Sequence, residues 1–315
     1  MVAADTLRVV FFGTPEFAVP TLDALLVSPY EIVGVVTQPD RPRGRGHKTS
    51  ASPVKAAALA AGRRVLQPAS MKDDRFLTEL SGFRPDLGVV AAYGQILTDA
   101  VLAIPRLGMI NVHASILPRY RGAAPVHRAI MNGEQETGVT IMRVVRALDA
   151  GPMLALAHRA IGPDETSEDV ERDLGRIGAQ LLIATVPELV DGRIVETPQD
   201  DAAATYAPRL TKDESWIDWK WPAERIHNRI RGLHPWPHAA TFLGSQRFIL
   251  HRSQVVHRTE ADEPGKILVA QGDQLLVSAG ILNVAITELQ AEGKRPMSVR
   301  EFLAGHPLTP GSIFG

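Results

Sequence analysis

Short apolar runs alternate with helix-like segments over the first half of the chain. The runs are typical of buried strands and lie at residues 7–12, 32–37, 87–92 and 108–113. Apolar side chains recur at helical spacing in residues 17–26, 53–61 and 73–80. Ser52 followed by Pro53 is typical of a helix start. This alternation predicts an α/β fold with a mostly parallel sheet that helices cover on both faces.

The pattern changes in the second half. Residues 137–145 and 153–161 predict two more strands, and residues 167–190 predict a long amphipathic helix. A polar, Ala-rich stretch at 198–204 is typical of a linker. A helix is predicted at 223–231, and short strands separated by turn residues are predicted at 248–251, 266–270, 274–278 and 283–289. We therefore expect a catalytic domain at 1–197, a linker at 198–208 and a small β-barrel at 209–315.

Composition narrows the class of protein. The 315 residues are enough for two domains, and 45% hydrophobic with 22% charged residues is typical of a soluble globular protein. We expect no membrane span, because no run of about 18 apolar residues occurs, and no secretory signal. The absence of cysteine excludes disulfides, a thiolate nucleophile and Cys-ligated zinc. The sequence predicts a cytoplasmic protein.

Basic residues are concentrated in one segment, although the formal net charge is only −1. Residues 38–72 contain eight Lys and Arg and a single acid, Asp40. A local field of this sign attracts a polyanion. The Gly- and Pro-containing stretch at 38–48 is either an ordinary solvated loop or an arm that grips a phosphate backbone. The candidate phosphate contacts are Arg41, Arg43, Arg45 and Lys48.

The strand at 108–113 ends with the most informative polar pair. Side chains alternate along a strand, so Asn111 and His113 point the same way. An amide donor beside a group that carries a proton near neutral pH suits attack of an amine on a carbonyl. A polar strand end that only caps a loop is the alternative. Asp149, in the turn after the strand at 137–145, is either a turn former or a carboxylate that orients His113 and favours its protonated form.

Several common site types do not fit. The turn after the first strand has one glycine, Gly13, and Pro15 lacks an N–H, which disfavours a nicotinamide or flavin enzyme. No P-loop and no G-x-S-x-G occurs. The ten histidines show no H-E-x-x-H spacing, so no metal is expected; His234 and His238 flank Pro-Trp-Pro in what is predicted to be a packed turn.

Collinear motifs across nearly the whole chain resemble those of the methionyl-tRNA formyltransferases. They are FFGTPEFA (11–18), TQPDRP (37–42), GRG (44–46), SPVK (52–55), AAYGQIL (91–97), NVH (111–113), PRYRGAAP (118–125), ETGVTIM (136–142) and LDAG (148–151). Departures occur at Ala114 and Ile116, where Gly and Leu are common, and in the Asp-Ala-Gly-Pro turn at 149–152.

The resemblance implies a Rossmann-like formyltransferase domain followed by an OB-like β-barrel. It implies 10-formyltetrahydrofolate as donor, methionyl-initiator tRNA as acceptor and no metal. Asn111, His113 and Asp149 take the catalytic positions, and the tRNA-gripping loop falls at about 38–52. The folate-contacting segment falls on Ser115, Ile116, Leu117 and Pro118. We expect a monomer whose barrel extends the basic surface through Arg225, Arg229, Arg231, Arg247 and Arg252.

On this hypothesis the amine of the esterified methionine attacks the formyl carbon while Asn111 and protonated His113 stabilise the oxyanion. Asp149 orients His113 and helps to pass a proton to the leaving nitrogen. Two alternatives remain open: a folate-dependent formyltransferase acting on glycinamide ribonucleotide or an amino sugar nucleotide, and a non-catalytic RNA-binding protein. A nicotinamide oxidoreductase is a more distant third.

Overall fold

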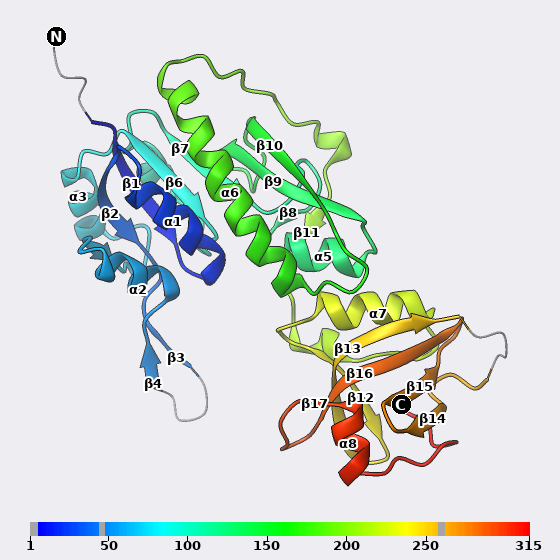
Figure 1. Cartoon of the computed structure of the whole chain (residues 1–315). Helices are drawn as coiled ribbons and strands as arrows, with labels where there is room; N and C mark the ends of the chain where they lie inside the picture. Colours follow the sequence, from blue (N-terminus) through cyan, green and yellow to red (C-terminus); the bar gives the residue numbers. More distant parts are fainter. Residues whose placement is uncertain (1–5, 44–47, 258–261) are drawn as a thin grey trace. The chain divides into compact units, whose positions relative to one another are not determined.

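The computed structural model of the chain describes residues 6–43, 48–257 and 262–315 (Figure 1). Contacts divide the chain into two compact units. The N-terminal unit comprises the chain up to Ala123 together with Thr137–Arg159 and Glu171–Ala207. The C-terminal unit comprises Ala124–Glu136, Ala160–Val170 and Pro208–Gly315. No helix in the described ranges is long and apolar enough to cross a membrane.

A seven-stranded sheet forms the centre of the N-terminal unit, with the strand order β10-β9-β7-β6-β1-β2-β5. Its strands are β1 (Arg8–Gly13), β2 (Glu31–Val36), β5 (Val65–Leu66), β6 (Leu87–Ala91), β7 (Met109–His113), β9 (Glu136–Arg143) and β10 (Met153–Ala160). The pairs β1–β2, β1–β6, β2–β5 and β6–β7 are parallel, whereas β7–β9 is antiparallel. The predicted mostly parallel α/β sheet is confirmed.

Helices cover both faces of this sheet, which explains the continuous apolar strands. The helical segments of the unit are η1 (Glu16–Ala18), α1 (Val19–Leu26), α2 (Pro53–Ala60), α3 (Asp74–Gly82), α4 (Asp99–Leu102), α6 (Ser167–Val190) and the exposed η2 (Asp201–Ala203). Ser52 caps α2 as predicted, because its hydroxyl accepts a hydrogen bond from Lys55 N at 3.1 Å. Val10 and Phe12 pack with Phe76 and Leu80 of α3, so β1 turns its alternate side chains to the opposite face.

Two short strand pairs have no counterpart in the sequence predictions. β3 (Arg41–Arg43) and β4 (Lys48–Ser50) form an antiparallel pair within the basic segment. β8 (Arg121–Gly122) pairs in parallel with β11 (Tyr206–Ala207). Strands of two or three residues carry too little side-chain pattern to be recognised.

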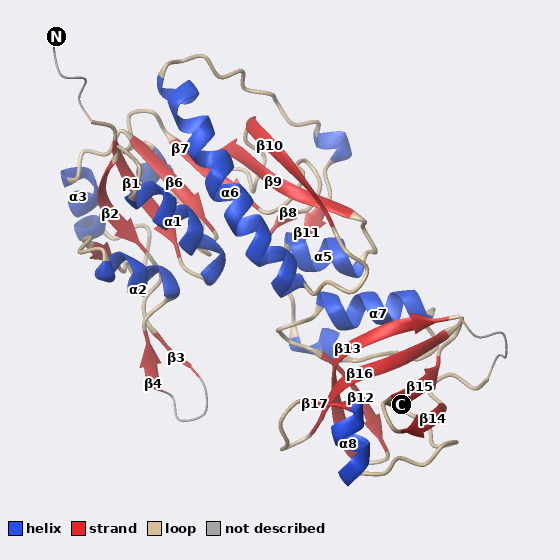
Figure 2. Cartoon of the chain, in the orientation of Figure 1, coloured by secondary structure: helices blue, strands red, loops and turns tan. Residues whose placement is uncertain are grey.

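The C-terminal unit is built on a six-stranded sheet of order β12-β13-β16-β15-β14, with β17 paired to β16 (Figure 2). Its elements are α5 (Pro125–Met131), η3 (Lys212–Ser215), α7 (Ala223–Gly232), β12 (Ala239–Leu243), β13 (Gln246–Val256), β14 (Ile267–Gln271), β15 (Gln274–Ser278), β16 (Asn283–Ala291), β17 (Met297–Ser298) and α8 (Val299–Gly305). The strand pairs β12–β13, β13–β16, β14–β15, β15–β16 and β16–β17 are antiparallel, and the unit is built of short strands as predicted. Phe248, Leu250, Leu289 and Phe302 are fully buried in its core.

Candidate active site

Strand β7 presents Asn111 and His113 on one face of the sheet. The other face of β7 is covered by α6, where a side chain on Gly178 would come within 2.6 Å of Val112 Cγ1. Because neighbouring residues alternate, Asn111 and His113 project away from α6. His113 is 6% exposed, and Asn111 is partly exposed. The predicted pair therefore shares a face that α6 leaves open.

The His113 ring lies between a carboxylate and a carbonyl. Its Nδ1 is 3.7 Å from Asp149 Oδ2, and its Nε2 is 3.1 Å from the carbonyl oxygen of Tyr120. Both neighbouring atoms are oxygens that can accept a hydrogen bond from the ring. The distance to Asp149 is too long for a direct hydrogen bond, but a group bound beside the pair can contact both side chains.

Asp149 reaches His113 by a route that the sequence did not indicate. Strand β9 runs antiparallel to β7 and ends with Arg143 opposite Ile110, three residues before His113. Three strand residues span about 10 Å, so the loop from β9 to β10 must run back along the sheet by about this distance to bring Asp149 near His113. Because β9 is antiparallel to β7, its C-terminal end does not lie beside the C-terminal end of β7. The folded-back loop at 144–152 brings the two side chains together instead.

Hydrogen bonds to the loop backbone and to the Asp149 carboxylate hold the loop in its folded-back position. Gly122 N donates to Asp149 Oδ2 at 2.8 Å. Gln199 Nε2 donates to the carbonyl oxygens of Asp149, at 2.8 Å, and Gly151, at 2.7 Å. The loop also requires glycine at 151, because a Cβ there would lie 1.9 Å from Arg143 O. Asp149 itself adopts a left-handed conformation, with φ of 47°.

Gln199 is held in place by a buried arginine. Arg121 is 4% exposed, and its Nε donates to Gln199 Oε1 at 3.0 Å while its terminal nitrogen contacts Asp201 at 2.7 Å. Sequence reasoning missed both residues. Gln199 lies within the predicted linker, where a polar residue carries no signal of its own, and its role depends on contacts across about 50 residues.

The predicted folate segment is a tightly bonded turn after β7. Thr140 Oγ1 donates to Ser115 O at 2.7 Å and accepts from Leu117 N at 3.2 Å. The Ser115 hydroxyl turns inward to Arg119 O at 2.7 Å. Ser115 and Leu117 are buried, whereas Ile116 and Pro118 are partly exposed. A ligand would therefore meet Ile116 and Pro118 rather than the serine hydroxyl.

Within the basic segment, strands β3 and β4 pair as a hairpin. Arg41 and Arg43 lie on β3, Lys48 lies opposite Arg43 on β4, and Arg45 lies outside the described residues. At the base, Asp40 Oδ2 is 2.5 Å from Lys55 Nζ, and this hydrogen bond lowers the pKa of Asp40. The single acid of the segment is therefore paired with a lysine outside the hairpin and does not offset the charge of the strands.

The arginines predicted to extend the basic surface differ in their surroundings. Arg231 does not belong to that surface: it is 7% exposed and donates to the carbonyl oxygens of Gly162 and Glu165. Arg225 lies 4.3 Å from the ring centre of Trp221. Arg247 lies 5.4 Å from that of Trp216. Arginines over aromatic rings keep their charge available to an anion.

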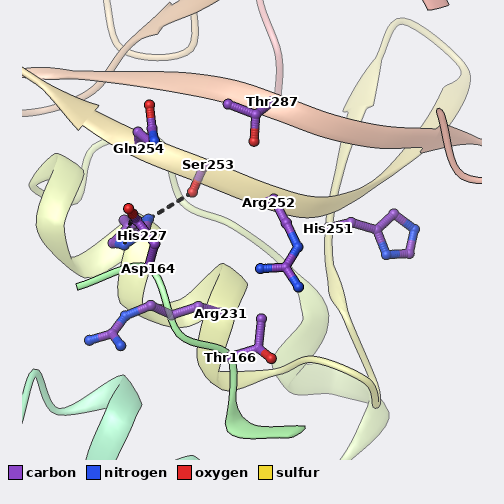
Figure 3. Close-up of a pocket in the computed structure, with 9 residues that line it drawn as sticks. All are labelled: Asp164, Thr166, His227, Arg231, His251, Arg252, Ser253, Gln254 and Thr287. Carbon is purple, nitrogen blue, oxygen red and sulfur yellow. Dashed lines mark hydrogen bonds and ion pairs between the residues drawn. The ribbon is translucent and has the colours of Figure 1, made fainter. Parts of the chain in front are cut away.

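A polar pocket of about 230 Å³ lies in the C-terminal unit (Figure 3). It is lined by Asp164, Thr166, His227, Arg231, His251, Arg252, Ser253, Gln254 and Thr287. His227 is fully bonded, with Nδ1 3.0 Å from Ser253 Oγ and Nε2 2.8 Å from Pro163 O. Burial lowers the pKa of His227, so the ring is neutral near pH 7. This pocket contains none of the three predicted catalytic residues.

Comparison with known proteins gives the same answer for both parts of the chain. Residues 7–186 match the formyl transferase family, and residues 209–307 match the formyl transferase C-terminal domain. A methionyl-tRNA formyltransferase from Caldanaerobacter subterraneus subsp. tengcongensis is 47% identical over 308 residues, which cover 98% of this chain and 99% of the relative. These matches confirm the resemblance predicted from the motifs.

Solved structures share the fold at low sequence identity. An N-formyltransferase from Helicobacter canadensis, in complex with folinic acid and dTDP-3-aminofucose, aligns with a TM-score of 0.68 at 16% identity, over 89% of this chain and 99% of that one. A methionyl-tRNA formyltransferase from Clostridium thermocellum aligns with a TM-score of 0.55 at 15% identity, over 79% and 94%. Since the sequence relatives extend over nearly the full length, the chain belongs to the methionyl-tRNA formyltransferase family.

Proposed function

We propose that the chain transfers the formyl group of 10-formyltetrahydrofolate to the α-amine of methionyl-initiator tRNA. The observation that carries this proposal is the position of His113, held between Asp149 and the Tyr120 carbonyl on the same strand face as Asn111. That arrangement supplies a donor pair for a developing oxyanion and a carboxylate for proton transfer. The full-length similarity to methionyl-tRNA formyltransferases supports the choice of substrates.

In the proposed reaction a bond forms between the methionine nitrogen and the formyl carbon. The carbonyl oxygen becomes anionic and receives hydrogen bonds from the Asn111 amide and the protonated His113 ring. Preorganised donors of this kind are each worth about 10²–10³ in rate. The oxyanion then collapses, the bond from carbon to the folate nitrogen breaks, and tetrahydrofolate leaves.

One proton must move from the attacking amine to the leaving nitrogen. His113 Nδ1 and Asp149 Oδ2 are 3.7 Å apart, so the attacking nitrogen or a water bound beside the pair can contact both atoms. The Asp149 carboxylate then passes the proton from the amine toward the leaving nitrogen, directly or through that water. The cycle as proposed uses no metal and no covalent intermediate on the protein.

The tRNA is proposed to bind through two basic surfaces. The hairpin β3–β4 supplies Arg41, Arg43 and Lys48, and the part of the loop outside the described residues adds Arg45. The C-terminal unit adds arginines that stack on tryptophan, at Arg225 and Arg247. In this proposal, residues 1–197 form the catalytic domain, 198–208 the linker and 209–315 the tRNA-binding domain. We further propose that the protein works in the cytoplasm as a monomer.

An acceptor competition tests the substrate assignment. The protein is given labelled 10-formyltetrahydrofolate together with charged initiator tRNA, charged elongator tRNA, glycinamide ribonucleotide or a dTDP-amino sugar. We expect label only on the initiator methionyl-tRNA. Label on the ribonucleotide or the amino sugar without label on tRNA would show that a small-molecule formyltransferase is the correct assignment. A lack of label on every acceptor would favour the non-catalytic alternative.

A further inference from the structure

Three histidine rings converge in the C-terminal unit, in a part of the chain that the proposed formyl transfer does not use. His234 and His238 flank the turn Pro235–Pro237, and His251 lies on β13. One nitrogen from each ring lies within 4.8 Å of the others, and within the described ranges no other set of His, Asp or Glu meets this criterion. The ring centres are 5.2 Å apart for His234–His238, 6.2 Å for His234–His251 and 4.6 Å for His238–His251.

Two of the rings are oriented by a hydrogen bond on their outer nitrogen. His234 Nε2 is 3.2 Å from Glu168 Oε2, and His251 Nε2 is 3.1 Å from Gln290 Oε1. In both rings this leaves Nδ1 as the remaining ligand atom. An imidazole that passes its other N–H to a carboxylate or a carbonyl oxygen is the usual arrangement around a bound metal, because the outer bond fixes both the tautomer and the ring plane.

The Nδ1 atoms of this histidine cluster have unusual surroundings. Nδ1 of His234 and Nδ1 of His238 are buried and have no hydrogen-bond partner in the described structure. Buried polar atoms are almost always bonded in folded proteins, so an unpartnered nitrogen needs an explanation. His227 in the same unit shows the ordinary case, since both of its nitrogens have partners.

The backbone at His238 is held in a conformation that side chains rarely adopt. Its φ is 66°, and its N–H donates to Leu233 O at 2.9 Å, which closes the turn. Strained backbone of this kind is concentrated at ligand sites, where the surrounding structure holds it in place. Here the left-handed conformation places the third ring against the other two.

We propose that His234, His238 and His251 bind one divalent transition-metal ion of the zinc class. A zinc ion about 2.1 Å from a ring nitrogen lies about 3.2 Å from the ring centre, so three tetrahedral ligands have ring centres roughly 5 Å apart. The observed separations lie on both sides of that value. Imidazole nitrogen favours zinc, nickel or copper over magnesium and calcium, which prefer oxygen. Water or a small anion completes the coordination.

The site is separate from the pocket of Figure 3. His251 lines that pocket, but in Figure 3 its ring extends away from His227 and Ser253. The ion would join the Pro-Trp-Pro turn to β13, and through the Glu168 hydrogen bond to the first turn of α6. A cross-link between three segments of one unit makes the ion a stabiliser of that unit.

Equilibrium binding of Zn²⁺ tests the proposal. Tag-free full-length protein is freed of metal with a chelator and titrated with Zn²⁺ in competition with a chromogenic indicator. We expect one tight site per chain, visible absorption typical of tetrahedral nitrogen ligation with Co²⁺, and no competition from Mg²⁺. Saturation at about 100 times the Kd should raise the apparent Tm by roughly 5 °C or more.

Variants identify the ligands. His238→Asn keeps a residue that tolerates positive φ and removes a ligand, and His251→Gln removes a second; each should weaken Zn²⁺ binding at least about 100-fold. Glu168→Gln should weaken it by about 10-fold. The matched control, His257→Gln, changes an exposed histidine outside the cluster and should bind as the parent does. Circular dichroism checks that each variant is folded. Stoichiometric binding that survives both ligand variants, or its absence in the parent, would show that the three rings only pack against one another.

Discussion

Gln199 offers a sharp test of how the catalytic loop is positioned. Its amide donates to the carbonyls of Asp149 and Gly151, and its oxygen accepts from Arg121. The variant Gln199→Met keeps the length and most of the volume of the side chain but removes all three hydrogen bonds. Gln199 touches none of the proposed reacting atoms, so it is a positioning residue.

The expected magnitude follows from the bonds that are lost. Each neutral hydrogen bond contributes about 1 kcal/mol net, so the two that hold the loop carboxyl-terminal to β9 contribute about 2 kcal/mol. If this free energy maintains Asp149 beside His113, its loss lowers kcat by about 10- to 30-fold, since about 1.4 kcal/mol corresponds to a factor of ten. Substrate affinity should change little, because the side chain lies behind the loop.

The assay measures kcat and KM for formyl transfer to methionyl-tRNA, with a pH profile of kcat. We expect a lower kcat, a nearly unchanged KM and a pH profile altered on its alkaline limb, because the proposed step needs a proton on His113 and a displaced Asp149 no longer helps to hold it. Asp200→Asn is the matched control, since Asp200 is the neighbouring residue and its carboxylate contacts only Ala202 N among the described hydrogen bonds. A Gln199→Met enzyme within twofold of the parent would refute the positioning role.

Three further predictions concern other parts of the molecule. His113→Gln should lower kcat about 10²- to 10³-fold with a smaller effect on KM; normal turnover would remove His113 from the mechanism. Arg41→Ser with Arg43→Ser should weaken tRNA binding and reduce the slope of log K against log salt by about 1–2, measured by filter binding; an unchanged slope would make the hairpin an ordinary surface feature. Hydrogen bonding to Arg128 lowers the pKa of Glu214. Glu214→Gln should therefore cost about 1–2 kcal/mol in urea unfolding at pH 7, and this difference should shrink as the pH falls from about 4.5, the ordinary pKa of Glu, through the lowered pKa of Glu214, because the stability from a lowered carboxyl pKa is lost as that group protonates. A cost that does not depend on pH would contradict this explanation.

The sequence predicted the elements whose pattern is local. Apolar runs gave β1, β2, β6 and β7 to within about a residue, and α6 has the predicted bounds, Ser167–Val190. β12 was not predicted, because its apolar run at Ala239–Leu243 has only five residues and follows closely after the turn at Pro235–Pro237. β13 is much longer than the predicted 248–251, since it alternates polar and apolar residues toward its end. α5 was not predicted either, and it packs on α7 in the C-terminal unit: a Cβ on Gly232 would lie 2.6 Å from Met131 Cγ.

The sequence predicted the residues of the candidate site but not the contacts that hold these residues in place. Asn111 and His113 are two apart on one strand, so their shared face follows from the alternation of side chains. The approach of Asp149 depends on a loop that folds back along an antiparallel strand, and no periodicity encodes that path. Gln199 acts from a segment that is polar for most of its length. Such positioning contacts join residues that are far apart in the sequence, so they can be recognised only in the folded chain.

The hydrogen-bond partners of three histidines explain why we propose a different role for each. His227 has a partner on both nitrogens and therefore has no capacity left for chemistry. His113 has one bonded nitrogen and one that lies 3.7 Å from a carboxylate oxygen, so a group bound beside the pair can contact both. His238 has a buried Nδ1 atom with no partner in the described structure, in a ring that lies beside two other imidazoles. His113 and His227 are similarly buried, so burial alone does not distinguish their roles. The number of ring nitrogens without a hydrogen-bond partner does distinguish them. We propose that a ring with both nitrogens bonded has a structural role, and that a ring with one free nitrogen beside a carboxylate moves protons. An unpartnered nitrogen among other imidazoles fits a metal ion.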